Sequence, residues 1–218
     1  LGSSFAYEWC LREPDWLVDL FCGDALSRSP DTNSLNTHLQ TELLAVDDES
    51  GLMRTLRRCR QRTMLHIIWR DITRRASTLE TTAALTALAD NCIRHAVDFL
   101  YPRLCQELGT PCNESGTPQS FLVLGMGKLG AFELNLSSDI DLIFAYDESG
   151  ETCFTENTSR QRSIPNREFF TRLGQKLITV IDKQTADGFV FRVDMRLRPY
   201  GDSGALALNY DAMEQYYQ

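Results

Sequence analysis

Several features are scarce or missing in this sequence, and each absence narrows the protein classes to which it can belong. No apolar run approaches the roughly 18 residues that a membrane-spanning helix needs, so no membrane association is expected. No C-x-x-C pair occurs among the seven cysteines, which argues against a zinc site. Basic residues are the minority, 22 against 30 acidic ones, and the net charge of −8 argues against a nucleic-acid-binding protein.

The remaining composition is that of an ordinary globular protein, with 43% hydrophobic and 24% charged residues. No signal peptide is visible, and scattered single cysteines are typical of reduced thiols, so a cytoplasmic location is expected. The chain begins at Leu1 and stops within a helix-like run at Gln218, which suggests a fragment of a longer protein. The cysteines are Cys10, Cys22, Cys59, Cys92, Cys105, Cys112 and Cys153.

Hydrophobic periodicity divides the chain into two parts. Residues 1–108 have apolar side chains at spacings of three and four, which predicts helices, including one over 35–45, one from near Gly51 and one opened by the capping box Ser77–Glu80. Residues 109–120 are rich in Gly, Pro and Ser and are expected to be a linker. Residues 121–218 contain short apolar runs, and we expect a buried strand at 121–124 and further strands at 142–146 and 188–197. A polar loop is expected over 147–165 and a helix over 166–185. The sequence therefore predicts an α+β protein, a helical region followed by a small α/β domain.

An arginine-rich surface is predicted on the helix that begins near Gly51. Charged helix faces usually contact water, so pairing with acidic neighbours is the simpler interpretation. A surface for an acidic partner or a phosphate is the alternative. The three histidines, His38, His66 and His95, are expected to be packed or exposed rather than metal ligands. The arginines are Arg54, Arg57, Arg58, Arg60, Arg62, Arg70, Arg74 and Arg75.

The segment 121–146 contains a glycine pattern that has two interpretations. Gly125, Gly127 and Gly130 fit the G-x-G-x-x-G turn of dinucleotide-binding folds. That fold joins two parallel strands by a full crossover helix, which needs a dozen or more residues. Only residues 131–138 lie between Gly130 and Asp139, about two helical turns at ~3.6 residues each. The dinucleotide interpretation is therefore disfavoured.

A nucleotidyltransferase site is the second interpretation of the same segment. Asp139 and Asp141 stand two residues apart at the entry to a strand, so their carboxylates should share one face. Paired carboxylates are the hard oxygen ligands that Mg²⁺ prefers. The glycine-rich turn at Gly127, followed by a short helix, could hold phosphate oxygens, and Ser137 and Ser138 add hydroxyl groups.

A second acidic segment lies farther along the chain, at residues 192–199. Asp194, Arg196 and Arg198 alternate as in a strand and should share one face with Arg192. In isolation this could be a salt-bridge ladder. Next to a D-x-D pair, we expect Asp194 to be a third metal carboxylate and the arginines to bind phosphate.

Long blocks of the sequence resemble the bifunctional glutamine-synthetase adenylyltransferase/adenylyl-removing enzymes, and the resemblance covers nearly the whole chain. The forms E-L-N-x-S-S-D-I-D and R-V-D-M-R-L-R-P are similar to the N-terminal, adenylyl-removing half of that family. The segments that carry the resemblance are 67–70, 125–130, 133–135, 137–144, 169–175 and 192–204.

The resemblance implies a nucleotidyltransferase-type fold, like that of DNA polymerase beta, with a short mixed sheet. It implies phosphorolysis of the adenylyl-tyrosine bond of glutamine synthetase by orthophosphate, with release of ADP, and regulation by a PII-type signalling protein. Asp139, Asp141 and Asp194 would be catalytic and metal ligands for Mg²⁺, or Mn²⁺. Nucleotide or phosphate would bind at Gly127, Lys128, Ser138 and, more weakly assigned, Arg196 and Arg198. Ala131 departs from the glycine common in the family, which casts little doubt because alanine tolerates a helical backbone.

Three alternatives remain open from the sequence. The domain could catalyse the forward, ATP-dependent adenylylation, because the same site chemistry permits it. It could be another nucleotidyltransferase with a different acceptor. It could also be a non-catalytic module that docks glutamine synthetase or a PII-type protein, although clustered carboxylates are unnecessary for docking.

Overall fold

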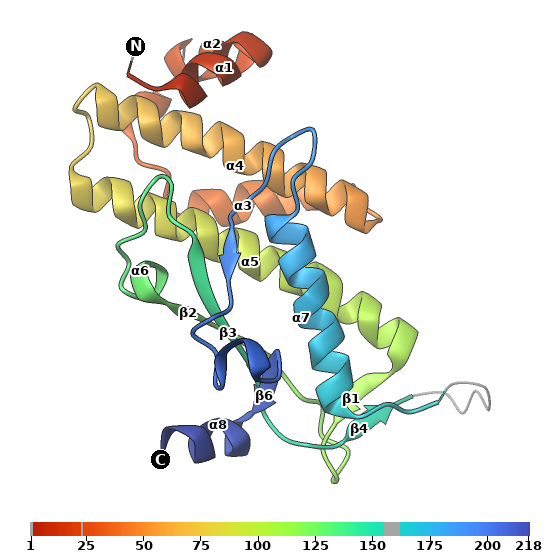
Figure 1. The fold of residues 1–218 in the computed structure, drawn as a ribbon. Coiled ribbons are helices and arrows are strands. Elements are labelled where there is room, and N and C mark those ends of the chain that lie inside the picture. The colour runs from red at the N-terminus through yellow and green to blue at the C-terminus, as the bar shows by residue number, and fades with distance from the viewer. Residues whose placement is uncertain (1, 23, 155–161) are drawn as a thin grey trace.

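The computed structural model describes residues 2–22, 24–154 and 162–218, and it begins with a layer of helices (Figure 1). The two long helices α4 and α5 run side by side, with α1, α2 and α3 packed around them. In the described ranges no helix is both long and apolar enough to cross a membrane. The bounds are α1 Ser4–Arg12, α2 Pro14–Cys22, η1 Ala25–Ser27, α3 Thr32–Leu43, α4 Glu49–Ile72 and α5 Thr78–Leu108.

Side-chain caps explain where the two long helices begin. Asp48 accepts a hydrogen bond from the Gly51 amide at 2.7 Å, and Ser77 accepts one from the Glu80 amide at 3.2 Å. Each cap satisfies an amide that has no partner within the helix. The Glu80 carboxylate pairs with Arg70 instead of returning to Ser77, so the predicted capping box is completed on one side only.

A small mixed sheet follows the helical layer. Strand β3 lies at its centre, antiparallel to β2 along one edge and parallel to β5 and β6 along the other. The antiparallel pairing of β2 with β3 rules out the parallel crossover of a dinucleotide-binding fold. The strands are β2 Phe121–Met126, β3 Ile140–Tyr146, β5 Val193–Asp194 and β6 Ala207–Asn209, and a separate pair comprises β1 Thr110–Cys112 and β4 Glu151–Cys153.

Helix α7, Asn166–Asp182, covers the inner face of the sheet and also contacts α4 and α5. Gly174 permits this close approach, because a Cβ at that position would lie 2.8 Å from Cδ2 of Phe144. One apolar core contains residues from the helical layer, α7 and the sheet. This mixed helix-and-sheet architecture confirms the predicted α+β class. The remaining elements are α6 Gly127–Gly130, η2 Gly201–Ser203 and α8 Tyr210–Tyr217.

Five local predictions need correction. The expected strand over 188–197 is reduced to Val193–Asp194, because residues 196–200 turn back on themselves. No helix forms over 131–138; the short helix is α6 itself. The expected linker contains β1 and the expected polar loop contains β4, although residues 155–161 of that loop lie outside the described residues. Strand β2 is only half-buried, since it forms an edge of the sheet.

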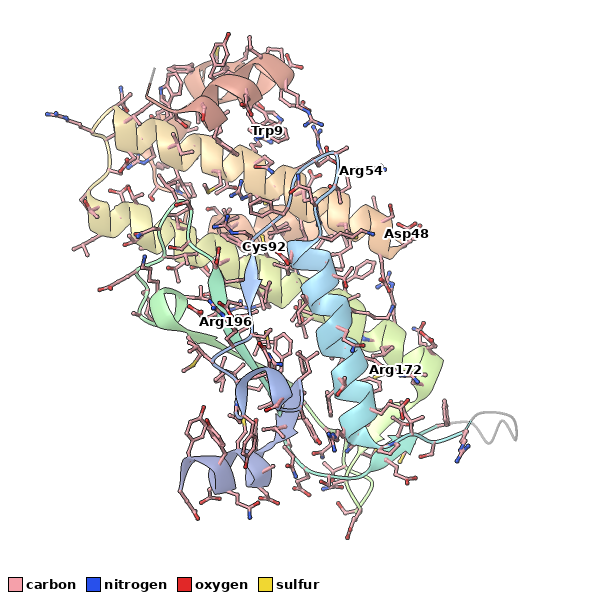
Figure 2. All side chains as sticks on the ribbon, viewed as in Figure 1. Trp9, Asp48, Arg54, Cys92, Arg172 and Arg196 are labelled. Carbon is pink, nitrogen blue, oxygen red and sulfur yellow. The ribbon has the colours of Figure 1, made fainter. Side chains whose placement is uncertain are left out.

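Neither interpretation of the arginine-rich helix is adequate, because its arginines divide into two groups. Arg58 and Arg62 are partly exposed and pair with Glu13, between α1 and α2, and with Asp19 of α2, as the simpler interpretation predicts. Three others are buried inside the protein, which neither interpretation anticipates, and they are Arg57, Arg60 and Arg70. Arg54 is exposed on the outer side of α4 (Figure 2).

The structure places the cysteines and gives partners for two of the histidines. All seven cysteines fall in the described ranges and are free thiols. His66 makes a 2.9 Å hydrogen bond with the Ala25 carbonyl, and His95 makes a 3.0 Å hydrogen bond with Oδ1 of Asn36. These two histidines therefore have structural partners on neighbouring segments.

Candidate active site

The turn after β2 brings backbone directly against the first acidic strand. Gly127 opens α6 with a φ of +52°, a left-handed conformation that favours glycine. A Cβ at Gly127 would overlap Oδ2 of Asp141, which lies on β3 opposite Met126. The glycine therefore supplies both the turn and the space that the Asp141 carboxylate occupies.

Asp141 and Asp194 are direct partners in the parallel pairing of β3 with β5. Paired residues on neighbouring strands point to the same face, and the strands lie about 4.8 Å apart. The two predicted carboxylates are thus brought together from segments separated by a loop, a helix and a turn. Asp139 precedes β3 by one residue, and its Oδ1 accepts a hydrogen bond from Nε of Arg192.

Arg192 and Arg196 each contact one of the predicted carboxylates. Arg192 also donates from Nη2 to the Ser137 carbonyl at 2.9 Å, which links the two segments that enter the site. Arg196 donates to both carboxylate oxygens of Asp194 through its guanidinium and to Oδ1 through its amide at 2.8 Å. The side-chain hydrogen bonds from Arg196, and then its amide, hold the pKa of Asp194 below the ordinary aspartate value.

The predicted common face of Asp194, Arg196 and Arg198 is wrong, because the strand ends at Asp194. Arg196 folds back onto Asp194 with its side chain 77% exposed, and Figure 2 shows it beside the sheet. Arg198 is buried to 12% side-chain exposure and donates to the Met195 carbonyl at 2.8 Å. Arg198 therefore supports the turn after β5, whereas Arg196 pairs with Asp194 at the surface.

The carboxylate set fits a hard divalent cation in its chemistry. Asp141 and Asp194 offer oxygens from one sheet face, and the glycine turn leaves room for the Asp141 carboxylate. Arg192 and Arg196 pair with Asp139 and Asp194, which shows that positive charge is favoured there. Among the residues that the structure describes, no three acidic, histidine or cysteine side chains are arranged as a ready metal cage. Binding such a cation would therefore require Arg192 and Arg196 to move off Asp139 and Asp194.

Three of the five predicted phosphate-binding residues, Gly127, Lys128 and Ser138, lie next to the acidic residues in the fold. Gly127 and Lys128 are exposed at the start of α6, and Ser138 is half-buried just before Asp139. The amide of Ser138 donates to the Asn135 carbonyl at 3.2 Å, which orders the approach to the acidic pair. Helix α6 has only four residues, so its dipole adds little to phosphate binding. Their role remains a prediction.

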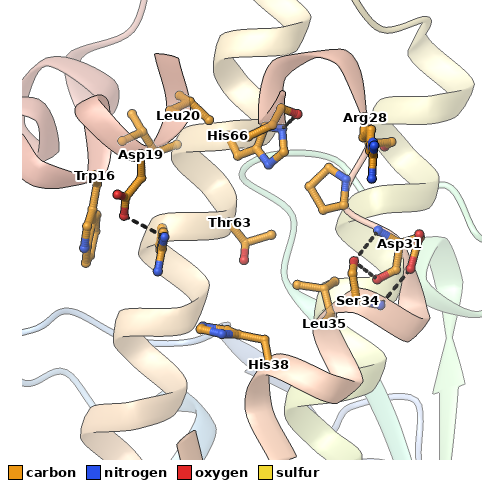
Figure 3. Close-up of a pocket in the computed structure, with 15 residues that line it drawn as sticks. Trp16, Asp19, Leu20, Arg28, Asp31, Ser34, Leu35, His38, Thr63 and His66 are labelled. Carbon is orange, nitrogen blue, oxygen red and sulfur yellow. Dashed lines mark hydrogen bonds and ion pairs between the residues drawn. The ribbon is translucent and has the colours of Figure 1, made fainter. Parts of the chain in front are cut away.

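Pockets in the helical region do not coincide with these residues. One pocket of about 420 Å³ lies between α2, η1, α3 and α4 and is lined by Trp16, Asp19, His38 and His66 (Figure 3). A second of about 310 Å³ lies on the inner side of β2, beside Asp90 of α5. The acidic residues line neither pocket: Asp139 is exposed just before β3, and Asp141 and Asp194 are half-buried on β3 and β5.

Sequence reasoning missed the contacts by which α4 holds the segment that leads into β5. Arg57 and Gln61 bind the turn that precedes β5, and Arg57 also binds the end of α7. The only available signal was the density of arginine on this helix. Spacing alone did not show which arginines point inward, because α4 has buried residues on nearly every side.

Comparisons with known proteins cover the whole chain. Residues 2–218 match the sequence model of the family described as glutamate-ammonia ligase adenylyltransferase. The chain is 54% identical over 218 residues to the bifunctional glutamine synthetase adenylyltransferase/adenylyl-removing enzyme of Pseudomonas putida, and 54% identical to that of Pseudomonas aeruginosa. It is 52% identical to the corresponding enzyme of Pseudomonas syringae pv. tomato. The alignments include all of this chain but only 22% of the length of each relative.

Proposed function

Because this chain belongs to the glutamate-ammonia ligase adenylyltransferase family, we propose that it catalyses removal of adenylyl groups from glutamine synthetase. Orthophosphate would attack the adenylyl phosphorus, the bond from phosphorus to the tyrosine oxygen would break, and ADP and a free tyrosine would result. The relatives are named as enzymes that act on glutamine synthetase, which supports this substrate. Regulation by a PII-type protein remains a prediction from the resemblance.

The pairing of Asp141 with Asp194 carries this proposal. It joins the two acidic segments on one sheet face, next to a glycine turn shaped around a carboxylate. A bound Mg²⁺ or Mn²⁺ would supply charge stabilisation for the entering and leaving oxygens of an in-line displacement. Asp139, Asp141 and Asp194 would hold that ion, which supports a nucleotidyltransferase rather than a docking module.

The chain's own residues have separate tasks in this reaction. Arg196 has an exposed side chain and is able to leave Asp194 and bind a phosphate oxygen, as a guanidinium does well. Gly127 and Lys128, at the mouth of the site, would orient the nucleotide phosphates. The departing tyrosine oxygen has an ordinary pKa near ~10, so a strong general acid is unnecessary.

The reverse direction is the second candidate. The names of the relatives contain both adenylyltransferase and adenylyl-removing activities, and the same carboxylates would serve attack by tyrosine on ATP. The two directions differ in their small-molecule substrate, so they are separable by experiment. The direction proposed here follows the N-terminal-half sequence forms E-L-N-x-S-S-D-I-D and R-V-D-M-R-L-R-P.

The test measures ADP released from adenylylated glutamine synthetase with Mg²⁺, with and without orthophosphate. We expect phosphate-dependent ADP release by the wild type and at least a ~100-fold loss in Asp139→Asn, because a charged metal ligand becomes neutral. Asp211→Asn is the matched control, since Asp211 is an exposed aspartate of α8 outside the site. Near-normal release by Asp139→Asn would contradict the site assignment.

Two further outcomes distinguish the alternatives. Transfer from ATP to unmodified glutamine synthetase, without phosphate-dependent ADP release, would favour the forward direction. If Asp141→Asn keeps both its activity and its Mn²⁺ binding, the carboxylates do not bind a metal. Absence of both activities and of metal binding in the folded wild type would favour the docking module.

A further inference from the structure

Arg57 is a fully buried charged side chain in the middle of the helical layer, at 0% exposure. Its Nε donates to the Gly188 carbonyl at 2.8 Å, and Nη1 donates to the carbonyls of Val180 at 2.8 Å and Met53 at 3.0 Å. Nη2 donates to the Lys183 carbonyl. One guanidinium therefore joins α4 to the end of α7 and to the turn after it.

The chemistry of this contact requires arginine. Burial is the main cause that lowers the pKa of Arg57, and the nearby carboxylates of Asp187 and Asp182 oppose that shift. The closest polar partners are backbone carbonyls, which a planar fork of five N–H donors can bind in several directions at once. A lysine ammonium has three donors on a single atom and cannot span the same set of carbonyls.

Two neighbours on the same face of α4 strengthen the contact. Gln61 donates from Nε2 to the Asp187 carbonyl at 2.9 Å. The guanidinium of Arg60 lies 5.5 Å from the ring centre of Phe189 and 5.9 Å from that of Phe191. Positions spaced by three and four residues face the same way on a helix, so the three side chains act together. We call Arg57, Arg60 and Gln61 the α4 clamp.

The clamp holds the segment that leads into β5. After Gly188, the amides of Val190 and Phe191 both donate to the Ile181 carbonyl, at 2.9 and 3.3 Å. Asp194 follows three residues later, on a strand that pairs with β3 at only two positions. Beside this short pairing and the contacts of Arg192 with Asp139, Ser137 and the Ile140 amide, the segment before β5 helps to fix the position of the strand.

We propose that Arg57 is a positioning residue, which sets the place of Asp194 beside Asp141 and so controls the affinity of the site for a divalent metal ion. It acts through Gly188, Val190 and Phe191 rather than by contact with the site. The helical layer then contributes to the geometry of the catalytic region. The metal-affinity part of this proposal rests on the proposed function, whereas the anchoring of residues 188–194 does not.

The test compares Arg57→Lys with Arg58→Met. Arg58 is the next residue on α4, partly exposed and paired with Glu13 at 2.9 Å, so its loss should not affect the clamp. Two quantities are measured well below the melting temperature: amide hydrogen exchange at Val190 and Phe191, and Mn²⁺ affinity by electron paramagnetic resonance. In Arg57→Lys we expect exchange at least ~10-fold faster and Mn²⁺ affinity ~10-fold weaker, the size typical of lost support for a metal ligand. Arg58→Met should change neither.

The outcomes separate this inference from the proposed function. Unchanged amide exchange in Arg57→Lys would overturn the anchoring of residues 188–194, whether or not the Mn²⁺ affinity changes. Suppose that Asp194→Asn weakens Mn²⁺ binding in the same assay. Faster amide exchange in Arg57→Lys with unchanged Mn²⁺ affinity would then show that Arg57 has a structural role only. If Asp194→Asn has no effect in the wild-type background, the metal assignment of the proposed function fails, and the control of metal affinity by Arg57 fails with it.

A second variant covers the case in which Arg57→Lys does not fold. Gly188 has a φ of +85°, and a Cβ there would lie 2.8 Å from Nε2 of Gln61. Gly188→Ala therefore disturbs the clamped turn without placing a new group in the core of α4. We expect the same two changes in this variant, and their absence in the folded protein would overturn the proposal.

Discussion

Arg57 and Arg60 lie within one turn of α4 and are both buried, yet their surroundings differ. Arg57 has a carbonyl partner for each of its three nitrogens. Arg60 donates from Nη1 to Oε1 of Gln61, packs against aromatic rings and leaves its Nε without a partner among the described residues. Burial lowers the pKa of Arg60 to about 10. Because that value lies below the pKa in the unfolded chain, the charge on Arg60 opposes folding at every pH below about 10.

Methionine substitutions should therefore affect the two positions differently. Arg57→Met leaves buried carbonyls without donors and should lower the free energy of unfolding by about 3 kcal/mol. Arg60→Met removes a buried charge that has no carboxylate partner and keeps contact with the aromatic rings, so we expect a change below about 1 kcal/mol. Urea denaturation of both variants at neutral pH measures the difference. A larger loss in Arg60→Met than in Arg57→Met would contradict this account.

At the scale of elements, the turn between β2 and α6 controls the position of a carboxylate. Gly127 has a positive φ, and a Cβ there would overlap Oδ2 of Asp141. Gly127→Ala must therefore strain the turn or displace the carboxylate, and displacement changes the distance between Asp141 and Asp194.

We expect Gly127→Ala to lower Mn²⁺ affinity about 10-fold or more, with a loss of stability of only about 1–2 kcal/mol from the unfavourable φ. Equilibrium Mn²⁺ titration and thermal unfolding of the same sample separate the two effects. Gly116→Ala is a suitable control, because Gly116 also has a positive φ, +83°, but has open space where its Cβ would be. Equal metal affinity in both variants would show that Gly127 is only a turn residue.

The whole molecule depends on contacts between parts that are far apart in sequence. The predicted division into residues 1–108, 109–120 and 121–218 is an interpretation of composition, and it remains a prediction. The apolar core nevertheless crosses that boundary, and α7 packs against both α4 and α5. Arg57 adds hydrogen bonds between residues 123 to 131 positions apart.

Residues 121–218 expressed alone should consequently fail to unfold cooperatively. The apolar face of α7 and the carbonyls that the α4 clamp binds would lose their partners. The 218-residue chain should show one unfolding transition. Thermal unfolding followed by circular dichroism, at near and far ultraviolet wavelengths, tests both expectations. A sharp, independent transition for 121–218 would mean that the α4 clamp is dispensable for folding of the sheet.

The sequence by itself determined the features that depend on local order: the long helices, the strands that became β2 and β3, the glycine turn and the D-x-D pair. Periodicity and caps act over a few residues, so they can be read without a structure. Only the tertiary structure decided that β5 ends at Asp194, that Arg198 turns away and that Arg57 is buried. The burial of Arg57 depends on Gly188, a partner more than a hundred residues away, and the bounds of β5 depend on its pairing with β3. Local pattern contains no information about such partners, and for Arg198 it did not show that the chain turns after Asp194 and directs the guanidinium to the Met195 carbonyl.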